Sequence, residues 1–327
     1  MSNRRLPATT IVAVIGCLLT AACADTAPTA PSSRLAAPAA SADRQQPSFV
    51  IETIDVPGAL GTSAQGINAA GDIVGFYADA SGRTHGFLLR DGAFTTIDYQ
   101  DPVTGEVADN TSARGIGPAG DIVGTHSNIG EEPVAAHGYH RTPDGAFMPV
   151  HFPGHLNEIP QRILADGTML GCRHDHDTMD SMRGIVIHGT QTAEMSNLYS
   201  SMTNGATPDG QIIVGFYINM MIMPAQTQAF VIQGGDTTAF TVPGTTFTTA
   251  WDVNPRGDIV GVFRDAAGVH GYVRTNSGRT LEGAEYTPVD VSGASATRAF
   301  GINARGDVVG TYVAGGTSHG FRATRVR

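Results

Sequence analysis

From residue 49 onward, apolar and polar residues alternate in short runs that glycine-rich turns separate. The run from Gly66 to Gly75 reads GINAAGDIVG, and close copies of it end at residues 124, 261 and 310. Weaker copies end at residues 171 and 215, so successive copies are 44 to 49 residues apart. Alternation over a few residues predicts β-strands, and the glycine between two runs predicts a tight hairpin. No run after residue 48 has a helical period, so we expect an all-β chain.

Two further phrases follow these copies along the chain. A tripeptide of histidine, glycine and an aromatic residue begins at four places: His85, His137, His270 and His319. The two weaker repeats have Arg183 and Gln228 at the matching position. A strand-like run then begins with an aromatic residue, as in FTTID from Phe94 to Asp98. Each repeat therefore predicts four short antiparallel strands, which at this repeat length are typical of one β-propeller blade.

The two ends of the repeat region complement each other. The last repeat stops soon after His319 and lacks its fourth strand, whereas an unmatched strand-like run, from Phe49 to Asp55, precedes the first repeat. Pairing these two segments would close a ring and leave no open sheet edge. We therefore predict a six-bladed β-propeller of four-stranded antiparallel blades, closed by the N-terminal strand. Five or seven blades are the alternatives, and a β-solenoid fits less well because hairpins would interrupt its coils.

The histidine tripeptides resemble a family of bacterial extracellular repeats that is named for the sequence His-Ala-Phe. The matching residues are His85, His137, His270 and His319, each followed by glycine rather than alanine. With the glycine phrases, the resemblance covers nearly the whole chain after residue 48. It implies an exported or surface-exposed β-repeat domain. It implies no particular activity.

The N-terminus has the features of an export signal. Arg4 and Arg5 precede an apolar run from Ala8 to Ala24, which is too short for a membrane-spanning helix. The segment from Leu19 to Cys23 resembles the bacterial lipoprotein signal, so we predict a signal peptide over residues 1–22 and lipidation of Cys23. An ordinary signal peptide that is cleaved near Ala22 or Ala24 is the alternative.

Residues 23–47 are rich in alanine, proline and serine, a composition that predicts an extended tether. Residues 48–327 then form the propeller. The expected location is the bacterial cell envelope, as an outer-membrane lipoprotein or in the periplasm, with an extracellular location as the alternative. The membrane would be contacted only through the lipid anchor, and the protein is expected to be a monomer.

Composition excludes several classes of protein. All 20 basic residues are arginines, and the lack of lysine excludes Schiff-base chemistry, pyridoxal-phosphate enzymes and P-loop nucleotidases. The formal charge of −10 argues against binding to nucleic acid. Cys172 is the one cysteine outside the predicted signal and anchor, so an intramolecular disulfide framework is excluded.

The lengths of the loops predict which face of the propeller binds partners. Loops from the second to the third strand of a blade, and from the fourth strand to the next blade, share one face, which we call the long-loop face. Several of these loops are long, such as residues 99–111 and 126–136, whereas most hairpins on the opposite face, the turn face, are tight. Binding residues usually lie on loops that a rigid scaffold carries. We expect an envelope protein, a glycan or a small ligand at the long-loop face.

Two loops in the middle of the chain contain candidate metal ligands. The candidates in the third repeat are His151, His155, His174, Asp175 and His176, because imidazole and carboxylate suit zinc or copper. A hydrated loop without metal is the alternative. All nine methionines after Met1 lie between residues 148 and 223, where they could bind copper or fill irregular cores. No cofactor is certain.

The first strands of the blades should line a central channel. There Arg162, Trp251 and Asp252 depart from the repeat pattern, which makes them candidate ligand-binding residues, and Arg114 and Asn204 depart from it as well. The repeated histidines are expected to be structural and to hydrogen-bond to the backbone of a neighbouring blade. The sequence has no nucleophile-elbow, zinc-protease or dinucleotide motif. The leading hypothesis is a non-catalytic, envelope-tethered binding or scaffold propeller. The alternative is a metal-assisted hydrolase or lyase, or a copper-binding protein, that uses the loops of the third and fourth repeats.

Overall fold

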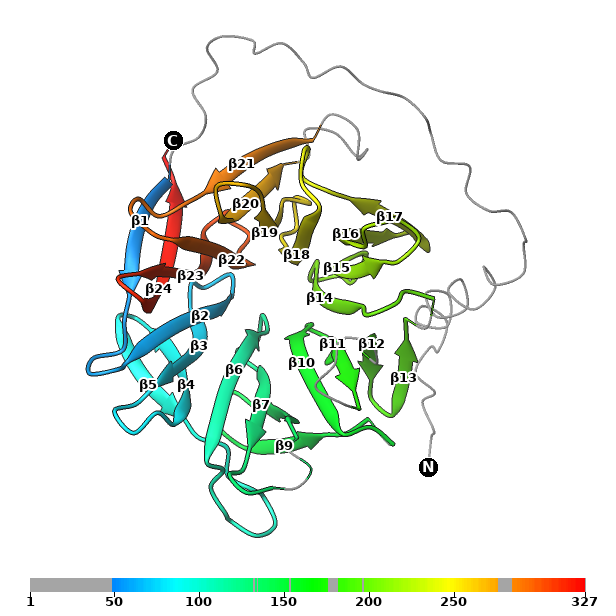
Figure 1. Ribbon diagram of the computed structural model, residues 1–327. Coiled ribbons are helices and arrows are strands. Elements are labelled where there is room, and N and C mark those ends of the chain that lie inside the picture. Colours follow the sequence, from blue (N-terminus) through cyan, green and yellow to red (C-terminus); the bar gives the residue numbers. More distant parts are fainter. Residues whose placement is uncertain are drawn as a thin grey trace.

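The computed structural model describes residues 49–131, 133, 135–152, 154–175, 182–195, 197–275 and 284–326. Every regular element among these residues is a β-strand, which confirms the predicted all-β class (Figure 1). No helix in this part of the chain has the length and apolar character needed to cross a bilayer. The predicted signal peptide, Cys23 and the tether lie outside the described residues.

The strands form antiparallel groups of four that we call blades. Blade 1 contains β2 (Gly61–Ile67), β3 (Ile73–Ala78), β4 (Thr84–Arg90) and β5 (Ala93–Ile97). Blade 2 contains β6 (Asn110–Ile116), β7 (Ile122–Ser127), β8 (His137–Arg141) and β9 (Phe147–Val150). Blade 3 contains β10 (Asn157–Ile163), β11 (Met169–His174), β12 (Arg183–His188) and β13 (Gln191–Glu194).

The second half of the chain follows the same plan. Blade 4 contains β14 (Met202–Ala206), β15 (Ile212–Asn219), β16 (Gln226–Gln233) and β17 (Asp236–Phe240). Blade 5 contains β18 (Phe247–Val253), β19 (Ile259–Arg264), β20 (Val269–Thr275) and β21 (Glu285–Val289). Blade 6 contains β22 (Ala296–Ile302), β23 (Val308–Ala314), β24 (Thr317–Arg325) and the first strand of the chain, β1 (Phe49–Ile54).

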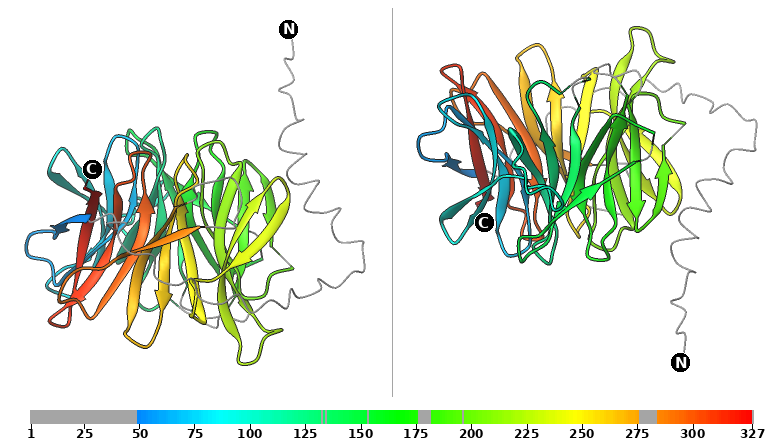
Figure 2. Two further views of the ribbon diagram at one scale, coloured as in Figure 1. Left: turned by 90° about the horizontal axis from the view of Figure 1, so that it is seen from above. Right: turned by 90° about the horizontal axis from the view of Figure 1, so that it is seen from below.

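The blades surround a central axis, and β2, β6, β10, β14, β18 and β22 lie nearest to it (Figure 1). Seen from the side, the strands run between the two faces of the molecule (Figure 2). Strand β1 pairs with β24 from Phe49 opposite Arg325 to Ile54 opposite Gly320, which is the pairing expected from the ends of the repeats. Ile54 then joins residues of blade 1, including Ile67 and Phe87, in one buried cluster, so blades 6 and 1 pack together.

Close packing inside the blades explains the last glycine of the repeat phrase. A Cβ atom on Gly75 would lie 1.9 Å from the carbonyl oxygen of Ser63 and 2.8 Å from the ring of Phe87. Phe87 comes from the histidine tripeptide and is fully buried. The last glycine of the glycine phrase therefore makes room for the aromatic ring of the histidine tripeptide. Any larger residue at position 75 would displace β2 or the ring.

The repeated histidines bind carboxylates rather than the backbone, so the expected partner was wrong. His85 Nδ1 lies 2.7 Å from Asp98 Oδ1, and the imidazole stacks on Tyr77. His319 makes the same contact with Asp55, at 2.9 Å. Burial of His85 opposes protonation, but its bonds to Asp98 and Asp79 outweigh this effect and raise its pKa. In blades 1, 5 and 6 the aspartate that ends the fourth-strand phrase is thus the partner of the histidine that begins the third strand. In blade 2, His137 instead bonds to Glu131 at 2.6 Å.

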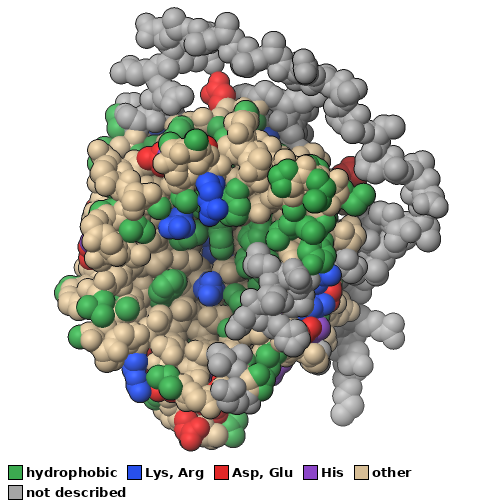
Figure 3. All heavy atoms as spheres, in the orientation of Figure 1, with side chains coloured by type: hydrophobic (Ala, Val, Ile, Leu, Met, Phe, Trp, Pro, Cys, Tyr) green, Lys and Arg blue, Asp and Glu red, His purple; other side chains and the backbone are tan. Residues whose placement is uncertain are grey.

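The predicted tight hairpins lie on the turn face, and basic side chains gather on the face shown in Figure 3. On the turn face, Asn68 Oδ1 accepts hydrogen bonds from the backbone N–H groups of Gly71 and Asp72, and Gly71 has a φ of 102°, so the predicted tight hairpin is present. Figure 3 shows the molecule in the orientation of Figure 1, and basic side chains gather near the centre of the face that it presents.

Candidate functional site

The innermost strand of each blade carries a β-bulge at the same place. In β2 the register shifts between Ala64 and Gly66, so Gln65 has no partner in β3. The same shift in the other five inner strands leaves one residue of each unpaired: Arg114, Gln161, Asn204, Trp251 and Phe300. We call these six the bulge residues. A bulge re-aims a side chain and disrupts the ladder locally, so the chain has six positions around the axis that are free of the pairing pattern.

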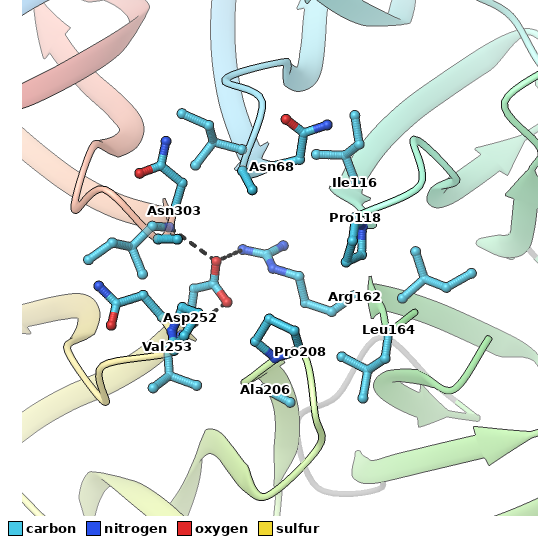
Figure 4. A pocket seen from close by; sticks show the side chains of 17 residues that line it. Asn68, Ile116, Pro118, Arg162, Leu164, Ala206, Pro208, Asp252, Val253 and Asn303 are labelled. Atoms are coloured by element: carbon cyan, nitrogen blue, oxygen red, sulfur yellow. Dashed lines mark hydrogen bonds and ion pairs between the residues drawn. The ribbon is translucent and has the colours of Figure 1, made fainter. Parts of the chain in front are cut away.

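The residue after the bulge is glycine in four blades. A Cβ atom on Gly115 would lie 2.3 Å from the carbonyl oxygen of Gln161, because neighbouring inner strands approach closely there. In blades 3 and 5 this position holds Arg162 and Asp252 instead. Their side chains extend across the channel and form an ion pair, with 3.4 Å between Arg162 Nη2 and Asp252 Oδ2 (Figure 4).

The guanidinium of Arg162 is bonded to backbone from several blades. Nη1 donates to the carbonyls of Arg114 (3.0 Å) and Gln161 (2.8 Å). Nη2 donates to the carbonyls of Gln65 (3.3 Å) and Phe300 (2.7 Å). Only 8% of Arg162 is exposed. Its donors are thus used inside the protein, where they connect the inner strands of blades 1, 2, 3 and 6.

Asp252 is equally enclosed and completes this connection. Its Oδ2 accepts a hydrogen bond from the backbone N–H of Ile302 at 3.1 Å, and its Oδ1 accepts one from Val253 at 3.0 Å. Burial raises the pKa of Asp252 despite the opposing effect of Arg162. The pair therefore acts as a plug that closes the channel, and a direct role of Arg162 or Asp252 in ligand binding stays a prediction.

A shallow pocket of about 170 Å³ lies outside the plug, on the turn face. Its collar is formed by the ends of the inner strands, with apolar side chains such as Ile67, Ile116 and Ile302. In Figure 4 the blades follow one another in the opposite rotational sense from Figure 1, so the two figures look at opposite faces. Three asparagines, Asn68, Asn254 and Asn303, also line the pocket, but their side-chain amides donate to the turn aspartates Asp72, Asp258 and Asp307. The small volume and these internal bonds favour the other side of the plug as the ligand site.

A larger cavity, of about 470 Å³, lies on the long-loop side of the plug, between blades 1 and 6. We call it the mouth cavity. Its polar lining includes Ser63, Gln65, Arg298 and Thr311, and Phe300 contributes a ring. Gln65 Nε2 donates to Ser63 Oγ at 2.6 Å, and this oxygen lies 2.5 Å from Thr311 Oγ1. Arg298 is partly exposed; its backbone pairs with Thr311, but its guanidinium has no ion pair or hydrogen bond with any residue that the structure describes.

Comparisons with solved structures identify the architecture. A protein of unknown function from Dyadobacter fermentans is 12% identical, with a TM-score of 0.51 over 84% of this chain and 96% of that chain. A triple mutant of AofleA from Arthrobotrys oligospora is 12% identical, with a TM-score of 0.50 over 85% of this chain and 87% of that chain. The β-propeller domain of the Trilobed protease from Pyrococcus furiosus is 11% identical, with a TM-score of 0.48 over 81% and 94%.

The chain has a β-propeller fold, because its four-stranded antiparallel groups surround a central axis (Figure 1). At these identities the likeness concerns the fold alone. Neither a family model nor a curated relative matches the sequence. The resemblance to the His-Ala-Phe repeats therefore rests on the tripeptides themselves.

Trp251 forms part of the aromatic wall of the propeller channel. Its Nε1 donates to Thr249 Oγ1 at 3.0 Å, and its ring packs edge-on against Phe300 with 5.0 Å between centroids. Phe300 lines the mouth cavity directly. Trp251 thus supports a residue of this cavity from the next blade, and its predicted contact with a ligand stays a prediction.

The candidate metal ligands are brought together only in part. His155 Nδ1 lies 2.7 Å from Asp175 Oδ1, and this bond lowers the pKa of Asp175. His151 is exposed, His174 ends β11, and His176 lies outside the described residues. Within the part of the chain that is described, no group of three histidine, cysteine, aspartate or glutamate side chains could hold a metal ion. The metal site stays a prediction.

The methionines and the cysteine of blades 3 and 4 divide into two sets. Met182 and Met202 are buried in one cluster with Cys172, which supports the interpretation that methionines fill these cores. Burial raises the pKa of the Cys172 thiol to about 12, so it is not a thiolate nucleophile at neutral pH. Met221 and Met223 lie in the loop between β15 and β16 and are 94% and 83% exposed.

Sequence reasoning missed several residues of the mouth cavity. Gln65, Arg298 and Phe300 were not predicted as site residues, although all three line it. A usable signal was present, because Gln65 and Phe300 directly precede the first glycine of their repeat phrases. Comparing that one position across all six repeats would have shown the set of bulge residues.

Proposed function

We propose that the chain is a six-bladed propeller, closed by the pairing of β1 with β24, and that it is a non-catalytic binding protein. Its ligand site is the mouth cavity on the long-loop side of the channel. The observation that carries the proposal is the asymmetry of the channel: the Arg162–Asp252 pair fills its turn side, while the opposite side opens into a cavity of about 470 Å³. A concave site with a few polar groups and aromatic walls is the usual form of a small-ligand site.

The lining of the mouth cavity favours binding over catalysis. Its described side chains are hydroxyls, an amide, a guanidinium and apolar groups, and they include no histidine, carboxylate or thiol. General acid–base and nucleophilic catalysis at neutral pH commonly use those three groups. Hydroxyl, amide and guanidinium groups instead orient a ligand through hydrogen bonds.

The loops of the long-loop face add an apolar contact surface, and Leu60 among them lines the cavity. Large apolar side chains that are more than half exposed occur in several loops of the long-loop face, and they include Leu60, Val103, Ile129 and Met221. Exposed apolar residues that gather on one face often mark a contact with another molecule. This supports a ligand that extends from the cavity onto the loops, such as a glycan chain.

A thermal-shift screen of the mature protein tests the proposed site. Neutral sugars, sugar acids, amino acids and dicarboxylates are screened, and ligands that raise the melting temperature are then titrated calorimetrically against two variants. We expect Phe300→Ala, in the mouth cavity, to weaken binding, and Pro118→Ala, in the turn-face pocket, to leave it unchanged. Binding that both variants retain, or turnover of the ligand by the purified protein, would overturn the proposal.

We further propose that Cys23 is lipidated and holds the propeller at a bacterial membrane. The basic start, the short apolar run and the Ala/Pro/Ser-rich tether support this location. Fractionation of cells that express the full chain tests it: Cys23→Ser should move the protein from the membrane to the soluble fraction. An unmodified mature N-terminus at another residue, found by mass spectrometry, would contradict lipidation.

A further inference from the structure

The channel carries positive charge on its long-loop side. Two sets of residues surround the axis there, namely the bulge residues and the residues two positions before them, which are Ser63, Ser112, Ile159, Met202, Thr249 and Arg298. The two sets include Arg114 and Arg298 and no carboxylate. Asp252, one position deeper, is already paired with Arg162. The protein as a whole has a formal charge of −10, so this local excess of positive charge is opposite in sign to the charge of the whole chain.

Neither guanidinium is neutralised by the described part of the protein. Arg298 has no polar partner there, and Arg114 has one long hydrogen bond, from Nε to Thr125 Oγ1 at 3.5 Å. Burial lowers the pKa of Arg114, and the groups that oppose this effect are a thiol and a phenol, Cys172 and Tyr139, rather than a carboxylate. An arginine stays charged at neutral pH, so a partly buried guanidinium without a counterion favours binding of an anion.

The remaining groups that line the mouth cavity favour a ligand that has hydroxyl groups and a ring as well as a charge. Ser63 and Thr311 supply hydroxyls, Gln65 supplies an amide, and Phe300 supplies a ring face. These groups match a ring with several hydroxyls, which hydrogen-bonds at its edge and packs its face on an aromatic side chain.

We propose that the mouth cavity binds a sugar acid, with the ligand carboxylate on Arg298 and the ring against Phe300. This inference rests on the proposed function and names its ligand class. Arginine can bind a carboxylate through two parallel N–H···O bonds, which a neutral sugar cannot accept. Simple anions lack the hydroxyls, and neutral sugars lack the charge, so the full set of groups is used only by a ligand that has both.

Calorimetric titration of the mature protein at pH 7 with D-glucuronate, D-glucose and acetate tests the inference. Glucose differs from glucuronate by replacement of the carboxylate with a hydroxymethyl group, and acetate retains only the carboxylate. We expect glucuronate to bind at least about tenfold more tightly than either probe. Loss of one charged hydrogen bond in Arg298→Met should weaken glucuronate binding by about 10- to 100-fold. Arg90→Met removes the same charge at the turn face and should leave binding unchanged.

Arg298→Lys extends the test. The lysine variant keeps the charge but not the paired donors, so its affinity should fall between those of the wild type and Arg298→Met.

The possible failures are distinguishable. Equal affinities for glucose and glucuronate, both lost in Phe300→Ala, would overturn the sugar-acid inference and keep the proposed binding site. Equal affinities for acetate and glucuronate would show a simple anion site and overturn the inference as well. If no probe binds, the inference is wrong, and the wider thermal-shift screen decides whether the mouth cavity binds another ligand.

Discussion

Replacing Arg162 by alanine should destabilise the propeller strongly, and more than replacing its partner Asp252 by asparagine. The substitution removes the donors to four backbone carbonyls, from Gln65, Arg114, Gln161 and Phe300. It also leaves Asp252, which is 6% exposed, without its cation. Removing one partner of a buried ion pair costs about 3–5 kcal/mol. This is a large part of the roughly 5–15 kcal/mol that stabilises a typical domain.

The change at the other partner should cost less. In Asp252→Asn the side-chain oxygen can still accept the N–H of Ile302, and Arg162 keeps its four carbonyl acceptors. We therefore expect a loss of about 1–3 kcal/mol, the range for a hydrogen bond to a charged group. The asymmetry follows from the larger number of hydrogen bonds that depend on Arg162.

A double variant tests the coupling between the two side chains. Arg162→Gly with Asp252→Gly gives both blades the residue that the other four have after the bulge. Both charges are then removed together, so the loss of stability should be smaller than the sum of the two single glycine variants by about 1 kcal/mol or more. This cycle separates the pair itself from the backbone effects of glycine, because the single variants carry the same backbone changes.

Equilibrium unfolding in urea provides the measurement. Trp251 is the one tryptophan and lies beside Asp252, so its fluorescence reports on the channel, and far-ultraviolet circular dichroism reports on the strands. Coincident transitions and an unchanged dependence on urea are needed for the comparison. Arg162→Ala within about 1 kcal/mol of the wild type, or additive effects in the double variant, would refute the interpretation of the pair as a plug.

Three further predictions concern other parts of the propeller. Burial lowers the pKa of His126 to about 4, so the folded state resists protonation and should lose stability as the pH falls from 7 to 4. The loss should be about 1–2 kcal/mol, less than the whole shift implies, because solvent screens this partly exposed ring, and His126→Phe should flatten it in urea unfolding. Gly75→Ala should cost about 3 kcal/mol or more in the same assay, because its Cβ would lie 1.9 Å from the Ser63 carbonyl oxygen. Gly82→Ala, which meets no atom within 4 Å but has a φ of 85°, should cost about 1 kcal/mol. If the blade 3 loops bind metal, elemental analysis will find zinc or copper in the wild type and less in His155→Ala; a metal-free wild type contradicts the site.

The β-propeller fold could be predicted from the sequence because its contacts are local and repeated. Each hairpin has its own turn residues, such as Asn68 and Gly71, and each glycine phrase reports a close approach within one blade. The pairing of β1 with β24 could be predicted as well, because the chain begins with an unmatched strand and its last repeat lacks a fourth strand. Because the same pattern of turn residues and glycines occurs six times, each copy supports the strands and hairpins predicted from the others.

The candidate site could be predicted only in part, because its contacts cross the channel. Arg162 was noticed as an irregularity, but its partners at Gln65 and Phe300 are 97 and 138 residues away in sequence. A residue that departs from the repeat pattern can contribute to packing or to ligand binding. Only the groups that surround it in the structure distinguish these two roles. Arg298 could not be predicted for a related reason. One arginine in a strand indicates an anion site only when no carboxylate lies near it, and its neighbours are known only from the structure.

The six bulges have a consequence for how such a protein can diversify. The extra residue of each bulge does not pair with the second strand, so replacing Gln161 or Phe300 leaves the register of the ladder unchanged. Within one inner strand, the paired residues therefore maintain the sheet, while the bulge residue is free to determine ligand preference. Descendants of this chain can acquire new ligand preferences one blade at a time while every hairpin, glycine contact and histidine–carboxylate bond stays as it is.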